Sequence, residues 1–157
     1  GAARATSVHF AREGAAELVL VNRTLEKALK LAETMANAAP NCPVRCLPLT
    51  DTEAIAAALR NVDCLIQATS LGLHHDDPLP LDPDLVPPEV AVMDMIYRAT
   101  PFLTAVGARG CPTADGRGML LHQGVRSLEL WTGRQGPVAV MRQGLEQALA
   151  ARSASRL

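Results

Sequence analysis

The stretch Leu18-Val19-Leu20-Val21-Asn22-Arg23-Thr24 decides how the rest of the chain is interpreted. Its four consecutive apolar residues, two of them β-branched, predict a strand buried on both faces, as in parallel sheets. Thr24 is placed to be the N-cap of a helix that follows. Doubly wound folds bind ligands where a helix begins at the carboxyl end of such a strand. We therefore expect a ligand site at Asn22, Arg23 and Thr24.

The end of this strand carries a basic residue and no carboxylate before Glu26. NAD-binding folds place Asp or Glu here to accept hydrogen bonds from the ribose 2′-hydroxyl. Arg23 cannot accept such a bond, but the forked donors of a guanidinium match a phosphate group. The stretch thus predicts a pocket for the 2′-phosphate of NADP. A solvated Arg in a strand-to-helix loop explains these residues equally well.

The chain opens with Gly1-Ala2-Ala3-Arg4-Ala5, followed by a run of small residues with helical character as far as Gly14. This opening is typical of the back end of a glycine-rich phosphate loop that passes into its helix. The distance onward to Arg23 is close to the ~20 residues that separate such a loop from the residue reading the ribose. Together, the two features favour a dinucleotide site that includes Gly1, Ala2 and Ala3.

The opening also predicts that a strand is missing. In dinucleotide-binding folds the glycine loop follows a first strand in the middle of the sheet, and no strand precedes Gly1. The strands ending at Asn22 and Ala68 should then each have an unpaired or poorly paired edge, which is costly for buried backbone groups. We expect these residues to be the later part of a longer chain.

Composition indicates a single ordinary globular domain over residues 1–157, with 48% hydrophobic residues and a net charge of −1. One Trp, one Tyr and two Phe, without a basic patch, argue against nucleic-acid binding. No membrane span or signal peptide is visible. We expect a cytoplasmic protein whose cysteines are buried thiols rather than disulfides or zinc ligands. They are Cys42, Cys46, Cys64 and Cys111.

Strands and helices alternate along the chain without hairpin signals. This order predicts an α/β fold of the Rossmann type, a doubly wound parallel sheet in a three-layer αβα arrangement. The expected strands are 18–21, 44–47, 62–68, 90–95 and, as a short last strand, 111–113. The expected helices are an opening run to residue 14, 25–38, 51–59, 102–108 and the terminal helices 120–131 and 138–151. Residues 72–88 form a Pro-rich loop, and the polar tail 152–157 is expected to fray.

Two further strand ends carry polar groups. Thr69 and Ser70 follow the third predicted strand and precede Gly72, so that their hydroxyls could bond a ribose or nicotinamide. A plain turn is the simpler interpretation of this segment. Tyr97 follows the next strand and places a phenol at the same edge, although a half-buried surface Tyr fits as well.

A glycine turn then leads into a helix that carries Met119 and Gln123. These two residues are four apart and share one face of the helix. A thioether and an amide facing the cleft would suit a nicotinamide ring and a hydroxylated substrate, respectively. His74, His75 and His122 lack the spacing of a metal site, so we expect no bound metal.

In these motifs the chain resembles the shikimate dehydrogenase family, whose members reduce 3-dehydroshikimate to shikimate with NADPH. The resemblance spans nearly the whole chain. The departures are Gln67 where Asn is usual, Lys27 where Arg is common, and a shorter loop between Tyr97 and Pro101. The matching motifs are Gly-Ala-Ala-Arg-Ala at residues 1–5, Asn22-Arg23-Thr24, Ala68-Thr69-Ser70-x-Gly72-Leu73, Asp94-Met95-Ile96-Tyr97 and Asp115-Gly116-x-Gly118-Met119-Leu120-x-x-Gln123.

The resemblance implies a role for each matching residue. Tyr97 and Gln123 would contact the substrate, and the backbones of Met95 and Gly116 would meet the nicotinamide end of the cofactor. The remaining cofactor residues would be Gly1, Ala2, Ala3, Thr69, Ser70 and the Met119 side chain, with Asn22, Arg23, Thr24 and Lys27 at the adenosine 2′-phosphate.

The resemblance also implies that catalytic residues are absent from this chain, because the family's catalytic Lys and Asp lie in an N-terminal substrate domain. We therefore expect residues 1–157 alone to bind NADP poorly, to aggregate or unfold easily and to show no shikimate-dependent NADP reduction. The complete protein is expected to be a monomer or homodimer acting on shikimate. Two alternatives stay open, namely a relative that uses quinate or NAD more broadly and a nucleotide-binding module without turnover.

Overall fold

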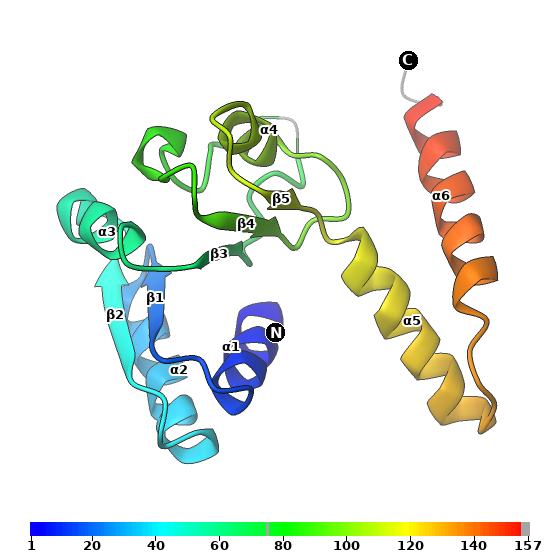
Figure 1. Cartoon of the computed structure of the whole chain (residues 1–157), viewed down its shortest axis with the longest axis horizontal. Coiled ribbons are helices and arrows are strands. Elements are labelled where there is room, and N and C mark those ends of the chain that lie inside the picture. Colours follow the sequence, from blue (N-terminus) through cyan, green and yellow to red (C-terminus); the bar gives the residue numbers. More distant parts are fainter. Residues whose placement is uncertain (75, 155–157) are drawn as a thin grey trace.

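The computed structural model describes residues 1–74 and 76–154, and it has the alternating α/β order that the sequence predicts (Figure 1). The helices are α1 (Ala2–Arg12), α2 (Leu25–Ala38), α3 (Thr52–Leu59), the 3₁₀ turn η1 (Pro83–Leu85), α4 (Pro101–Ala108), α5 (Arg117–Thr132) and α6 (Val138–Ala154). The strands are β1 (Leu18–Asn22), β2 (Val44–Pro48), β3 (Cys64–Gln67), β4 (Ala91–Asp94) and β5 (Thr113–Ala114).

The expected elements are present, and their ends differ by a few residues. The fifth helix begins at Arg117 rather than at residue 120, because Gly116 serves as its N-cap. The sixth helix continues to Ala154, so the tail expected to fray from residue 152 is helical there. Its last three residues, 155–157, lie outside the described residues.

All paired strands are parallel, and they form two separate sheets. Strand β1 pairs with β2, from Leu18 opposite Val44 onward, and β3, β4 and β5 form the second sheet in that order. Among the described residues no strand pairing joins β1 to β3. The prediction that these two strands each have an unpaired edge is thereby confirmed.

The open edges change the expected burial. The sequence predicts β1 as buried on both faces, but this is wrong: Val21 is 38% exposed and Leu18, Val19 and Leu20 are only half-buried. Apolar side chains in a parallel sheet become buried when strands flank them on both sides and helices cover them. Here β1 has a neighbour on one side only, so its side chains remain partly in contact with solvent.

The cysteines show the same effect. All four are free thiols, as expected, and Cys42 and Cys111 are buried. Cys46 is half-buried and Cys64 is exposed, so the expectation of buried thiols is wrong for Cys64. Cys64 begins β3 at the edge that faces no described strand. Partial burial still raises the pKa of the Cys46 and Cys64 thiols, and the nearby charge of Asp63 adds to the effect at Cys64.

Helices pack against the strands of both sheets, in agreement with the α/β fold that the sequence predicts. One apolar cluster packs α3 and α4 against β4, with Ile55, Val92 and Phe102 at its centre. A second, smaller cluster packs α1 and α2 against the start of β1 and β2 through Ala11 and Met35. No described helix is long and apolar enough to cross a membrane.

Candidate cofactor site

The end of β1 passes into α2 through a short turn held by one side chain. The Asn22 side-chain oxygen accepts a hydrogen bond from the Thr24 amide at 2.9 Å. Thr24 is the N-cap residue of α2, as predicted, but its hydroxyl makes no capping hydrogen bond. The amides of the first helical turn therefore lack a side-chain acceptor, which is the arrangement that favours an anion at a helix N-terminus.

Two cations lie beside this helix N-terminus. Arg23 and Lys27 are both exposed, and neither forms an ion pair or side-chain hydrogen bond with another described residue. The one acidic residue in the first turn of α2 is Glu26. An exposed guanidinium without a carboxylate partner can form bidentate bonds to a phosphate, and the adjacent ammonium adds to the local positive potential.

The second turn of α1 lies close to the end of β4. The Thr6 hydroxyl is 3.8 Å from the Met95 sulfur, across 89 residues of sequence. Gly1 is the N-cap of α1 and, like Ala2, is exposed, whereas Ala3 is half-buried. A second helix N-terminus thus lies beside the carboxyl end of a strand, where doubly wound folds place the pyrophosphate.

The end of β4 and the start of α5 are in direct backbone contact. The Gly116 amide donates to the Ile96 carbonyl oxygen at 2.9 Å, and the Met95 amide donates to the Gln67 carbonyl oxygen at 3.0 Å. A Cβ atom built on Gly116 would lie 2.1 Å from the Met95 carbonyl oxygen. Only glycine permits this approach, so Gly116 is needed because of close packing rather than because of a special backbone conformation.

The segment after β3 presents two exposed hydroxyl residues, Thr69 and Ser70. It is held by Gln67, whose buried side chain donates to the Leu71 carbonyl oxygen at 2.8 Å and accepts from the Thr69 amide at 2.5 Å. The Gln67 amide, which is longer than the Asn usual in the family, thus makes both hydrogen bonds that hold this turn. The Thr69 hydroxyl accepts from the Leu71 amide, and its proton can still be donated to a ligand.

The residues expected at the substrate end are also exposed. Tyr97 is 38% exposed at the end of β4, and Met119 is 36% exposed on the first turns of α5, where Gln123 also lies exposed. The structure therefore links the β4 end, the β3 end and the α5 start through backbone hydrogen bonds. No hydrogen bond or ion pair among the described residues joins this group to Arg23.

The sequence analysis missed several polar residues that shape this edge, among them Asp77 and Arg98. Both bond the loop after β3, and Arg98 reaches it from 25 and 26 residues away. Asp94 is fully buried, and its carboxylate accepts from the Thr100 hydroxyl at 2.6 Å. The Asp94 match to the family motif was one available signal, whereas the Arg98 bonds depend on contacts distant in sequence.

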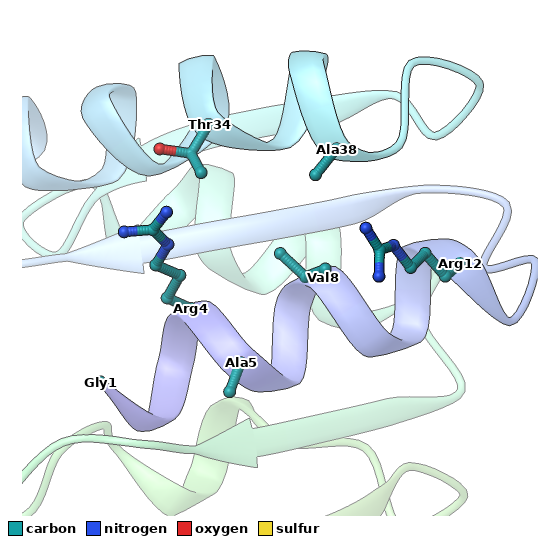
Figure 2. Close-up of a pocket in the computed structure, with 7 residues that line it drawn as sticks. All are labelled: Gly1, Arg4, Ala5, Val8, Arg12, Thr34 and Ala38. Carbon is teal, nitrogen blue, oxygen red and sulfur yellow. The ribbon is translucent and has the colours of Figure 1, made fainter.

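A groove between α1 and α2 lies on the helical layer rather than at the strand ends (Figure 2). It has a volume of about 420 Å³, and the guanidinium groups of Arg4 and Arg12 extend from α1 toward α2 across it. Of the predicted cofactor residues, Gly1 is the one that lines it. The groove is therefore not the predicted site.

The histidines do not form a metal site in the described part of the chain. No group of three His, Cys, Asp or Glu residues there could hold a metal ion. His74 and His122 are exposed, and His75 lies outside the described residues.

Comparisons with known proteins bear on this site. Residues 116–146 match the model of the shikimate 5′-dehydrogenase C-terminal domain. The NADP(+)-dependent shikimate dehydrogenase of Moorella thermoacetica is 40% identical over 156 residues, which cover 98% of this chain and 52% of that protein. The chain spans about half the length of the curated relatives it matches.

Two solved structures share the fold closely. Shikimate 5-dehydrogenase from Listeria monocytogenes, in complex with shikimate and NAD, has a TM-score of 0.81 at 27% identity over 92% of this chain and 52% of its own. Quinate dehydrogenase from Corynebacterium glutamicum, in complex with NAD, has a TM-score of 0.81 at 27% identity over 91% and 50%. In sequence and in fold, the chain therefore matches the C-terminal domain of the shikimate dehydrogenases, the family that its motifs resemble.

Proposed function

We propose that this chain binds NADP along the carboxyl ends of its strands and forms the cofactor-binding half of an NADP-dependent shikimate dehydrogenase. The observation that carries the proposal is the pair of unpartnered cations, Arg23 and Lys27, at an uncapped helix N-terminus. The 2′-phosphate distinguishes NADP from NAD, and a phosphate dianion is the ligand that such a site favours. Asn22 and Thr24 would complete this phosphate pocket.

The other predicted residues would position the remainder of the cofactor. The uncapped start of α1, with Gly1, Ala2 and Ala3, would face the pyrophosphate. Thr69 and Ser70 offer exposed hydroxyls, and the closely packed backbones of Met95 and Gly116 would meet the nicotinamide end. The Met119 thioether adds an apolar contact for the nicotinamide. These roles rest on the resemblance and on the positions of the residues at the ends of the strands.

The bound cofactor would supply a hydride, which reduces the ketone of 3-dehydroshikimate to the alcohol of shikimate. This chain would orient the nicotinamide, and Tyr97 and Gln123 would bond the substrate. The resemblance places the Lys and Asp that handle the proton in a separate substrate domain. We therefore propose that catalysis needs both halves, in a cytoplasmic protein that acts on a small molecule and is a monomer or homodimer.

The open edges of β1 and β3 support a link between the two halves. Each edge presents backbone groups that a parallel strand could pair with. We propose that such a strand, from the part of a longer protein that precedes this domain, fills the space between the two sheets. Filling it would also cover β1 and the exposed Cys64.

Substituting Arg23 tests the cofactor assignment. We expect Arg23→Ala to weaken NADP binding by about 1.5–3 kcal/mol, the range for hydrogen bonds to charged groups, and to leave NAD binding nearly unchanged. Arg45→Ala is the matched control, because the Arg45 guanidinium binds Glu17 at 3.3 Å near the amino end of the strands. Fluorescence titration of each variant of the complete protein with both cofactors measures this. Equal losses for NADP and NAD in Arg23→Ala would contradict the phosphate-binding role.

Quinate is a second candidate substrate, favoured by the close fold match to a quinate dehydrogenase. Steady-state assays of the complete protein with shikimate and with quinate distinguish the two. NADP binding without turnover of either would favour a nucleotide-binding module instead.

A further inference from the structure

The loop after β3 has no regular secondary structure over the described residues 70–74 and 76–77, and charged side chains hold its backbone. The Asp77 carboxylate accepts from the Gly72 amide at 2.9 Å and from the His74 amide at 2.8 Å. Buried or half-buried backbone groups need such partners, and bonds to an ionised group are stronger than neutral ones. Asp77, at the C-terminal end of the loop, therefore fixes the backbone of the residues that precede it.

A second tie comes from a distant part of the chain. Arg98, just beyond the end of β4, donates from one guanidinium nitrogen to the Gly72 carbonyl oxygen at 2.7 Å and to the Leu73 carbonyl oxygen at 2.6 Å. Gly72 thus has its N–H bonded to a carboxylate and its C=O bonded to a guanidinium. The two loops at the carboxyl ends of β3 and β4 are joined at this residue.

The packing at Gly72 supports a fixed arrangement. Its φ of +99° is strained for residues with a side chain, and a Cβ atom there would lie 3.0 Å from Thr100 Cγ2 and 3.3 Å from Ile96 Cδ1. The opposing segment is itself held by buried Asp94, which accepts from the Ile96 amide at 3.0 Å. Arg98 therefore fastens the loop to a rigid support.

We propose that Arg98 is a positioning residue for the nicotinamide end of the cofactor site. By joining the two loops it sets the position of Thr69 and Ser70 relative to Tyr97, its own neighbour in sequence. This inference rests on the proposed function, because it assumes that NADP lies along this edge. It assigns Arg98 a role that differs from phosphate binding, since its guanidinium is already bonded to backbone carbonyls.

The test compares two ligands that differ in the nicotinamide half. NADP reaches the Arg98 loops, whereas 2′,5′-ADP carries the adenosine and 2′-phosphate and ends before them. We expect Arg98→Ala to weaken NADP binding roughly tenfold, as for the loss of one charge-assisted hydrogen bond, while 2′,5′-ADP affinity stays within about twofold. Arg98→Lys keeps the charge without the guanidinium fork and should restore part of the loss. Added guanidinium, well below denaturing concentrations, should rescue Arg98→Ala.

Arg109→Ala is the matched control. Arg109 also ties a loop, by bonding the Asp84 carboxylate at 2.5 Å and the Asp84 carbonyl oxygen at 3.3 Å, but it follows α4 at the other edge of the sheet. We expect this variant to bind both ligands like the parent protein. Amide exchange over residues 71–74 should accelerate in Arg98→Ala and stay unchanged in Arg109→Ala.

The outcomes separate the inference from the proposed function. Unchanged NADP binding in Arg98→Ala, or an equal loss for both ligands, would overturn the positioning role even if the parent protein binds both ligands well. Unchanged amide exchange would overturn the fastening of the loop. All these variants are made in the complete protein, and a complete parent protein that binds neither NADP nor 2′,5′-ADP would instead overturn the proposed function.

Discussion

Replacing Gly116 by Ala should separate the start of α5 from the end of β4. The added Cβ would lie 2.1 Å from the Met95 carbonyl oxygen and 2.6 Å from the Met95 carbonyl carbon, and both are backbone atoms that cannot rotate away. Close C···O contacts in proteins begin at about 3.3 Å, so the two segments must separate by roughly 1.2 Å. That movement also weakens the hydrogen bond from the Gly116 amide to the Ile96 carbonyl oxygen.

The cost combines overpacking, about 1–3 kcal/mol, with a weakened hydrogen bond, about 1 kcal/mol, and we expect a loss of about 3 kcal/mol. For a chain of this size that corresponds to a drop in Tm of roughly 6–12 °C. Urea unfolding followed by circular dichroism should show a lower midpoint with an unchanged slope.

Gly118→Ala is the control for this experiment, because the site lies two residues further on, in the first turn of α5, with nothing within 4 Å of the added Cβ. Ala is the better helix former, so this variant should be as stable as the parent protein or slightly more stable. If Gly116→Ala and Gly118→Ala unfolded within about 2 °C of each other, the reasoning from close backbone contact would be refuted.

Three further predictions concern the loop, the substrate end and the open edge. Hydrogen bonds from the His74 amide, and secondarily from the Gly72 amide, lower the pKa of Asp77, so its contribution to holding the loop is fully present above its unfolded pKa and is lost as the pH falls through the lowered folded pKa. The Gly72 amide resonance should follow this titration in NMR and lose its pH dependence in Asp77→Asn. Gln123→Ala in the complete enzyme should impair substrate use while NADP affinity stays close to that of the parent protein, as substrate kinetics and a separate cofactor titration would show; a collapse of NADP binding would instead place Gln123 in the cofactor site. Cys64 should react with a thiol reagent well before Cys42 and Cys111 in residues 1–157, and protection of Cys64 there would argue against the open edge at β3.

Local sequence determined most of the secondary structure. The apolar face of α2 predicts this helix with the bounds that the structure has, and the apolar run of β1 predicts its strand to within one residue, because four β-branched or Leu residues and a helical period are strong short-range signals. Asp51 caps α3 by accepting from the Ala54 amide at 3.0 Å, as an N-terminal Asp favours. The weaker signals gave less accurate bounds: β5 has two residues and was expected slightly earlier.

The candidate site was predictable where it consists of residues at the ends of strands. Arg23, Thr69 and Tyr97 lie where parallel strands end, and the topology brings such ends to one edge. Sequence spacing could also place Met119 and Gln123 on one helix face. These positions follow from backbone geometry, which local residue types largely specify.

Tertiary structure alone decided how this edge is held together. The Arg98 bonds to Gly72 and Leu73 span 25 and 26 residues, and Thr6 meets Met95 across 89 residues. No local pattern encodes such pairings, because each depends on where the chain returns in space. Burial was likewise decided by neighbours: Val21 and Cys64 have the side chains of interior residues, yet they remain exposed because their strands are each paired on one side only among the described residues.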